Sequence, residues 1–144
     1  MIEKSYVMVK PEFANKHQVI FEVKRRLEKE NLKILKESYI QYSIEDARKH
    51  YTAHVGKDFY PALEKYITSD IAFGMIVEGE NAIEKIRELI GSTKNPAEGT
   101  IRYDIPKMLG LELRVRENVV HASDSTEAAE QEIKIFEDNI KRKQ

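Results

Sequence analysis

The hydrophobic and polar positions in the first third of the chain switch between the period of a strand and the period of a helix. Tyr6 to Val9 is a short β-prone run that stops before Pro11, because proline cannot donate to a sheet ladder. Apolar residues then recur at helical spacing from Gln18 to Glu30. Leu32 to Tyr42 alternates again, with a slip of phase after Ile34. The pattern predicts a strand, an amphipathic helix and a second strand.

The middle of the chain predicts two short helices, a buried strand and another helix. Residues 43–51 begin with a serine suited to an N-cap and continue with acidic residues in the first turn. A second helix is expected to start around Pro61. Residues 71–77 are continuously apolar, as expected of a strand covered on both faces. Residues 82–90 show helical spacing, and Gly91 stands at the position that ends such a helix.

The last third of the chain begins with a stretch that predicts irregular structure. Residues 91–117 hold three of the six glycines and two of the four prolines. The alternation within 111–115 predicts a short edge strand there. Another short strand is expected at 119–120, just before a histidine. Cap-forming residues at 123–125 then precede a helix whose apolar face recurs through 129–140.

This order of elements predicts an α+β fold. It places strands and helices as β-α-β-(αα)-β-α-loop-β-α, and such alternation indicates a sheet with helices packed on it. We expect a ferredoxin-like β-α-β-β-α-β sandwich with an inserted helical pair after the second strand. A chain of 144 residues suits one domain, which we assign to 1–144.

Composition narrows the class of protein. Lys plus Arg number 24 against 25 Asp plus Glu, so nucleic acid is an unlikely main partner. The chain has no cysteine, which excludes disulfides, thiol catalysis and Cys-ligated zinc and suits a reducing compartment. Its longest apolar run, 71–77, is too short to span a bilayer, and the start has no secretory signal. We expect a soluble cytoplasmic protein with no membrane partner.

The sequence lacks two common nucleotide-binding motifs, and its one candidate metal-binding pattern is weak. The sequence has neither a P-loop nor a dinucleotide-binding glycine pattern. His50 and His54 stand four residues apart on a predicted helix, a spacing that can bind metal. Tyr51 occupies the place where a zinc protease has its glutamate, and no third ligand is evident. Two solvated helix histidines are therefore the favoured interpretation.

His121 is a candidate nucleophile. It follows a short apolar strand and precedes a helix N-terminus, where free N–H groups favour anions. A neutral imidazole is a competent nucleophile, although a strand-end histidine can also be purely structural. Glu132 borders the buried stripe of the last helix and needs a partner, which Ser123 or His121 could supply. The alternative for Glu132 is a side chain that extends to water.

Several cations could form a phosphate site. Lys10 directly follows the first strand, Arg87 lies near the end of a predicted helix, and a turn-rich loop presents Thr100 and Arg102. If these groups converge on one cleft, they would bind phosphates. Taken singly, each is an ordinary surface charge.

A collinear set of motifs resembles the nucleoside diphosphate kinase family. Residues 118–125, NVVHASDS, resemble its N-x-x-H-[GA]-S-D active-site signature. The resemblance covers about Ser5 to Phe136. The other matching segments are Val9-Lys10-Pro11-Glu12, His50-Tyr51 with Phe59-Tyr60-Pro61-Ala62-Leu63, Val77-Glu78-Gly79 with Ala82-Ile83 and Arg87, Gly91-Ser92-Thr93 with Asn95-Pro96-Ala97, and Gly99-Thr100-Ile101-Arg102.

The resemblance implies transfer of the γ-phosphate of a nucleoside triphosphate to a nucleoside diphosphate through a phosphohistidine, with broad base specificity. His121 would be the nucleophile, oriented by Glu132 and Ser123. Phe59 would stack on the base, and Mg²⁺ would be held mainly by the nucleotide phosphates rather than by protein ligands. The residues implied to hold phosphates and ribose are Lys10, Tyr51, Arg87, Thr93, Arg102 and Asn118.

The resemblance also implies a homo-oligomer, at least a dimer. A sheet with an edge strand and an apolar helix face gains from burial in a twofold contact. Two other functions stay open at this point. A non-catalytic ferredoxin-like nucleotide-binding or interaction module would use His121 structurally, and a DNA-binding role would rest on Lys141-Arg142-Lys143 alone.

Overall fold

A computed structural model describes residues 1–111 and 119–143 of the chain. Four strands and seven α-helices make up these ranges, with one short 3₁₀ turn, η1 (Thr52–His54). In chain order they are β1 (Ile2–Val9), α1 (Pro11–Ala14), α2 (His17–Lys29), β2 (Lys33–Ile40), α3 (Ile44–His50), α4 (Tyr60–Thr68), β3 (Ala72–Glu80), α5 (Ala82–Ile90), α6 (Ile101–Met108), β4 (Val120–Ala122) and α7 (Thr126–Lys143).

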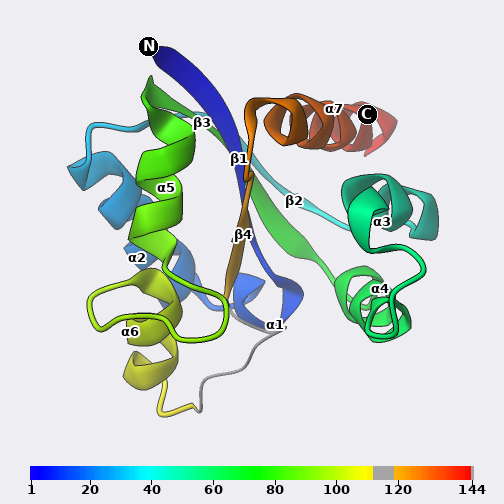
Figure 1. The fold of residues 1–144 in the computed structure, drawn as a ribbon, viewed down its shortest axis with the longest axis horizontal. Coiled ribbons are helices and arrows are strands. Elements are labelled where there is room, and N and C mark those ends of the chain that lie inside the picture. The colour runs from blue at the N-terminus through cyan, green and yellow to red at the C-terminus, as the bar shows by residue number, and fades with distance from the viewer. Residues whose placement is uncertain (112–118, 144) are drawn as a thin grey trace.

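The strands form one antiparallel sheet in the order β2-β3-β1-β4. This order and the α3–α4 pair after β2 confirm the predicted ferredoxin-like sandwich with its inserted helices (Figure 1). β3 is buried from Ala72 to Val77, as its continuous apolar run predicts. In the register of β1 with β4, Met8 lies opposite His121, so the two side chains share a face of the sheet.

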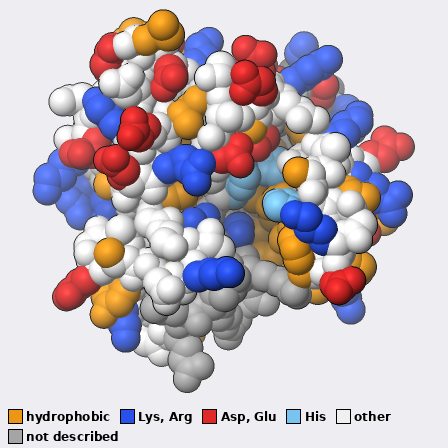
Figure 2. Space-filling model, viewed as in Figure 1, with side chains coloured by type: hydrophobic (Ala, Val, Ile, Leu, Met, Phe, Trp, Pro, Cys, Tyr) orange, Lys and Arg blue, Asp and Glu red, His pale blue; other side chains and the backbone are white. Residues whose placement is uncertain are grey.

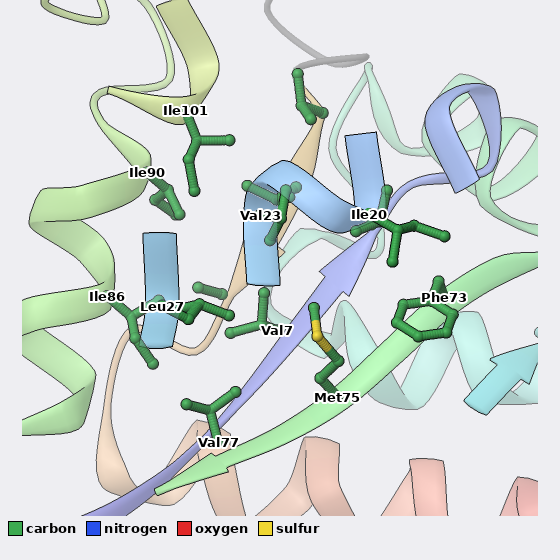
Figure 3. Close-up of a cluster of buried hydrophobic side chains, with 14 of the residues drawn as sticks. Val7, Ile20, Val23, Leu27, Phe73, Met75, Val77, Ile86, Ile90 and Ile101 are labelled. Atoms are coloured by element: carbon green, nitrogen blue, oxygen red, sulfur yellow. The ribbon is translucent and has the colours of Figure 1, made fainter. Parts of the chain in front are cut away.

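One face of the sheet packs against α2, α5 and α6 (Figure 1). Alternate strand residues such as Val7, Met75 and Val77 meet helix residues such as Val23 and Ile86 there (Figure 3). Strand side chains point alternately to the two faces, so the neighbours of these residues point the other way. The buried core of this layer is apolar and supports the sheet, and α5 and α6 also carry cationic side chains that reach the site described below.

The opposite face packs against α3, α4 and α7. Tyr6 and Met8 of β1 are fully buried there beside Phe136 of α7, and the hydroxyls of Tyr6 and Tyr42 lie 2.7 Å apart. Gly74 allows this packing, because a Cβ at that position would lie 2.6 Å from the Tyr6 hydroxyl and 2.7 Å from the Phe136 ring. His121 lies on this face.

Local signals in the sequence account for several boundaries. The Ser43 side chain accepts from the backbone N–H of Asp46, and the Asp46 carboxylate accepts from the N–H of Ser43, which forms a capping box at the start of α3. The slip of phase in the second strand corresponds to a shift of register between Ile34 and Lys36. Ser125 caps α7 by accepting from the N–H of Ala128.

Two expectations for the chain were wrong or incomplete. The irregular stretch predicted over 91–117 contains a helix, α6, with Thr100 as its N-cap residue and Pro106 inside it. Proline removes a hydrogen-bond donor, but α6 still forms because Ile101 and Ile105 lie one turn apart and are both buried in the core. α1 was not predicted at all. The edge strand expected at 111–115 lies mostly outside the described residues, and Leu111 is not in a strand.

Candidate active site

The centre of the site is a hydrogen-bonded chain through His121, Glu132 and Ser123. Nε2 of His121 lies 2.9 Å from Oε1 of Glu132, and the Ser123 hydroxyl donates to the same oxygen at 2.8 Å. Ser123 is itself fixed to β1, because its Oγ accepts from the N–H of Tyr6 and its N–H donates to the carbonyl of Tyr6. The last helix and the two strands therefore hold the imidazole in one orientation.

His121 differs from its sequence prediction in one respect. The pattern predicts a side chain at the end of a strand, projecting from the sheet edge, but His121 is the central residue of β4 and lies on the α3, α4 and α7 face. Its side chain is 20% exposed, so it can still react. The residue Val119 just before β4 has φ of 76°, a left-handed conformation that is rare for a β-branched residue, and its carbonyl accepts from the N–H of Lys10.

Burial and positive charge keep the His121 imidazole neutral. Removal from water, followed by the charges of Lys10 and Arg102, lowers the pKa of His121 to about 3. Burial also raises the pKa of Glu132, while His50 and the hydrogen bond from Ser123 lower it. Because a neutral imidazole has one protonated and one unprotonated nitrogen, a carboxylate at Nε2 favours the proton on that atom. Nδ1 is then the nitrogen with a free lone pair.

His121 lies at a cleft of about 1670 Å³. Residues of α5, α6, α7 and the segment around Tyr51 also line this cleft. Figure 2 shows histidine side chains in a hollow that lysine and arginine side chains border. The residues predicted for the catalytic and phosphate site that line it are His121, Glu132, Arg87, Arg102, Thr93, Thr100 and Tyr51.

Arg102 joins three segments of the cleft. Its guanidinium donates from Nη1 to the Gly91 carbonyl at 2.9 Å and to Oγ1 of Thr93 at 3.3 Å, and from Nη2 to the Val120 carbonyl at 3.0 Å. Burial, followed by the charge of Arg87, lowers the pKa of Arg102 to about 10, so it stays cationic at neutral pH. Its buried Nε has no hydrogen-bond partner among the described residues.

Gly91 allows the start of α6 to pack closely against the end of α5. It ends α5 with φ of 92°, and a Cβ there would lie 2.5 Å from Oγ1 of Thr100. Arg87, near the same end of α5, donates from Nη1 to the Asp124 carbonyl at 3.3 Å. The two arginines therefore reach the cleft from different helices, and both are anchored by backbone carbonyls.

Of four further predicted residues, one lines the cleft, two do not, and one lies outside the described residues. Tyr51 is buried, its ring centroid is 6.0 Å from that of His121, and its hydroxyl has no partner in the described ranges. Lys10 is buried and does not line the cleft, but its charge acts on His121. Phe59 is also absent from the cleft lining and lies beside His54, with ring centroids 5.4 Å apart. Asn118 lies outside the described residues.

Sequence reasoning missed the position of His50. It predicted a solvated histidine, but His50 is only 8% exposed and its ring centroid is 4.5 Å from that of His121. Burial, followed by the nearby His121, lowers the pKa of His50 to about 3. His54, the other half of the predicted pair, also lines the cleft. The signal was available in the helical period, because His50 follows the buried Ala47 by three residues.

Comparisons with known proteins identify the family. The sequence model described as "Nucleoside diphosphate kinase" matches residues 3–140. A nucleoside diphosphate kinase of Staphylococcus epidermidis is 44% identical over 138 residues, which cover 94% of this chain and 87% of that protein. One from Methanocaldococcus jannaschii is 43% identical over 145 residues, covering 97% of this chain and 98% of that protein.

A solved structure agrees with these sequence matches. A halophilic nucleoside diphosphate kinase from Halobacterium salinarum in complex with CDP superposes with a TM-score of 0.84 at 34% identity, covering 94% of this chain and 88% of that one. Among the helices of residues 1–111 and 119–143, none combines the length and the hydrophobicity of a membrane-spanning segment. From its sequence matches, its strand order and the agreement with this structure, the chain belongs to the nucleoside diphosphate kinase family.

Proposed function

We propose that this protein transfers the terminal phosphate of a nucleoside triphosphate to a nucleoside diphosphate in two steps, with His121 as the carrier. In the first step the Nδ1 lone pair attacks the γ-phosphorus, the bond to the β-phosphate oxygen breaks, and the nucleoside diphosphate leaves. In the second step the terminal phosphate oxygen of another diphosphate attacks the same phosphorus, the N–P bond breaks, and the imidazole is restored.

The His121–Glu132 contact is the observation that carries this proposal. The carboxylate at Nε2 favours a proton on that nitrogen and leaves Nδ1 as the nucleophile. When Nδ1 gains the phosphoryl group, the ring becomes more positive, and a carboxylate 2.9 Å away stabilises that charge. Ser123 holds the carboxylate in place. Glu132 and Ser123 are in this account positioning residues.

The cationic and hydroxyl groups of the cleft suit a polyphosphate. Arg87 and Arg102 would neutralise the phosphates, and Thr93 would add a hydroxyl donor. The Tyr51 hydroxyl and the charge of Lys10 would act nearer to His121. Phosphoryl transfer needs little beyond alignment and charge neutralisation, which such a set can supply.

Base and sugar contacts complete the proposed site. Phe59 would offer a stacking face, which every base accepts, and broad specificity would follow. Lys57 Nζ lies 5.9 Å from the Phe59 ring centroid, so the ring already lies next to a cation. Asn118 is proposed as a contact to ribose or phosphate on the family resemblance alone.

Mg²⁺ is the divalent cation we expect with the nucleotide. Within the described ranges, the one grouping of three His or carboxylate ligand atoms is His50, His121 and Glu132, and most of its donors are imidazoles. Mg²⁺ prefers oxygen ligands, so the phosphates would be its main ligands, and the cleft carboxylate of Asp124 could contribute through water. When bound, the ion would neutralise phosphate charge.

A homodimer is the proposed minimum assembly. β2 lies at one edge of the sheet, and α2 lies beside it, with Lys24 donating to Glu37. Phe21 on α2 and Leu35 and Tyr39 on β2 are exposed apolar side chains. A twofold contact would bury them together with the sheet edge. The cytoplasmic location and the single domain over 1–144 stay predictions.

Brief incubation with Mg²⁺ and γ-labelled ATP tests the function. The expected result is label on the protein that is lost in acid and retained in base, as a phosphohistidine requires. The label should leave the protein on addition of any nucleoside diphosphate. Stable label on a hydroxyl residue, or none at all, would contradict the proposal and favour a non-catalytic nucleotide-binding module.

A further inference from the structure

His50 is a buried histidine whose hydrogen-bonding capacity is unused. It is 8% exposed, and neither Nδ1 nor Nε2 has a hydrogen-bond partner among the described residues. A buried polar group without a partner is costly, and an imidazole normally has at least one hydrogen bond. The proposed phosphoryl transfer gives His50 no role. Its ring lies beside the proposed nucleophile, because the ring centroids of His50 and His121 are 4.5 Å apart.

A ligand atom from each of His50, His121 and Glu132 lies within 4.8 Å of the other two. Two imidazoles and one carboxylate are a donor set found at catalytic zinc sites, which keep a fourth position open. The grouping is unsuited to Mg²⁺, which prefers oxygen.

We propose that His50, His121 and Glu132 form a binding site for a single Zn²⁺ or a similar borderline-soft cation, and that the bound ion switches the nucleophile off. The metal would take the place of the proton between His121 Nε2 and Glu132. That proton moves to Nδ1, so the ring stays neutral but loses the lone pair that attacks phosphate. This consequence rests on the proposed role of His121, whereas metal binding itself does not.

The geometry requires a modest movement. Ligand atoms around a tetrahedral zinc lie roughly 3.3 Å apart, given bond lengths of about 2.0 Å. The His121–Glu132 pair, at 2.9 Å, has to open slightly, and His50 has to move inward. His50 is the last residue of α3, so its side chain can shift without moving a strand. The open coordination position would face the cleft, which all three residues line.

Direct metal binding tests the site on the whole, unmodified chain. Zn²⁺ is titrated into the purified protein in competition with a chromophoric chelator, without nucleotide. One equivalent should bind, and His50→Gln should weaken binding by at least about tenfold, because one of three ligands is lost. His54→Gln is the matched control, since His54 lines the same cleft but is outside the three-ligand group; its affinity should match that of the unmodified protein.

Two further readouts keep the test decisive. Co²⁺ in place of Zn²⁺ should give a visible absorption band of a four-coordinate site, absent from folded His50→Gln and Glu132→Gln as judged by circular dichroism. Equal zinc affinity in His50→Gln and His54→Gln would overturn the site. Zinc that binds with one equivalent but leaves phosphohistidine formation from Mg²⁺-ATP unchanged would overturn the switch. An absence of zinc binding would overturn the site and leave the proposed phosphoryl transfer standing.

Discussion

Nε2 of His121 lies 2.9 Å from Oε1 of Glu132, although the two residues belong to different elements, β4 and α7. This contact determines which ring nitrogen is available, because a carboxylate acceptor favours the Nε2–H tautomer. The same oxygen accepts from Ser123, which is bound to the backbone of Tyr6. The orientation of the proposed nucleophile thus depends on two strands and one helix.

Replacement of the proposed nucleophile gives the first prediction. His121→Ala should abolish phosphate transfer and protein labelling, because no other group of the 118–125 motif can form a phosphoramidate. The chain should still fold, since the His121 side chain is partly exposed at the cleft. A coupled assay and the labelling experiment above measure the loss. His17→Ala is the control, because His17 is exposed at the start of α2; a His121→Ala protein with activity close to that of His17→Ala would rule out the mechanism.

Glu132→Gln gives the second prediction. Glutamine keeps the size of the side chain but removes its charge, so it orients His121 less firmly and no longer stabilises a phosphorylated ring. We expect transfer to slow on the order of tenfold to a hundredfold, by analogy with groups that orient a histidine from its second nitrogen. Glu130→Gln is the control, since Glu130 is exposed on the same helix.

The measurement for Glu132 separates kcat from KM. A positioning role predicts a lower kcat, a slower formation of phosphohistidine and an unchanged KM, because Glu132 touches no nucleotide in this account. A merely structural role would instead lower the melting temperature and the amount of active protein without changing the rate per active site. A change confined to KM would contradict the assignment.

The sequence predicted the parts of the fold that local physics determines. Ser43, the phase slip near Ile34 and Gly91 each act over a few residues, and each corresponds to a capping box, a register shift or a helix end. The pairing of Glu132 with Ser123 and His121 could also be expected, because a half-buried carboxylate needs partners and these residues precede it closely.

Other features depend on contacts between distant segments and could not be predicted. α6 forms because Ile101 and Ile105 bury against a core built mainly from other elements. The helical period places His50 on the same face of α3 as Ala47, but the contact of its ring with that of His121 depends on how α3 packs against the sheet. The glycines and prolines of 91–117 suggested a loop because local propensity is weaker than such packing.

Phe59→Ala gives the third prediction. If the ring supplies only a stacking face, its loss should weaken binding of all nucleotides by a similar ~1–3 kcal/mol. Isothermal titration with one purine and one pyrimidine diphosphate measures this. Tyr66→Ala on α4 serves as a control for perturbation of the helix that follows Phe59. A loss confined to purines, or no loss at all, would place the base elsewhere.

The two neutral histidines give the fourth prediction, a loss of stability in acid. Their pKa values fall from 6.5 in the unfolded chain to about 3 in the fold. Between these values the unfolded state binds more protons, so the free energy of unfolding falls as pH is lowered through this window. Each imidazole contributes about 1.4 kcal/mol per pH unit. The raised pKa of Glu132 acts in the opposite direction and offsets part of the loss.

Urea denaturation at about pH 7 and about pH 5 measures this dependence, within the range where imidazoles titrate. His50→Gln should show a smaller fall in unfolding free energy than the unmodified protein, because one of the two buried imidazoles is gone. His17→Gln should match the unmodified protein, since His17 is exposed. Equal falls in all three proteins would contradict the prediction.

The fifth prediction concerns assembly. One chain weighs 16.8 kDa, so light scattering behind a sizing column should give twice that mass or a larger even multiple. Phe21 is 68% exposed on α2, beside the β2 edge, and a second copy would cover it. Phe21→Glu combined with Tyr39→Glu should shift the mass toward 16.8 kDa, because two charges would be buried without partners.

Met108→Glu is the matched control for this surface. Met108 is an exposed apolar residue on α6, which lies away from β2 (Figure 1), so its replacement should leave the dimer intact. Monomeric unmodified protein at micromolar concentration would refute the dimer. If Met108→Glu instead separated a larger assembly into dimers, the α2–β2 surface would still be the primary contact and α6 would belong to a second one. Dissociation to monomers by Met108→Glu alone would show that the twofold contact lies elsewhere.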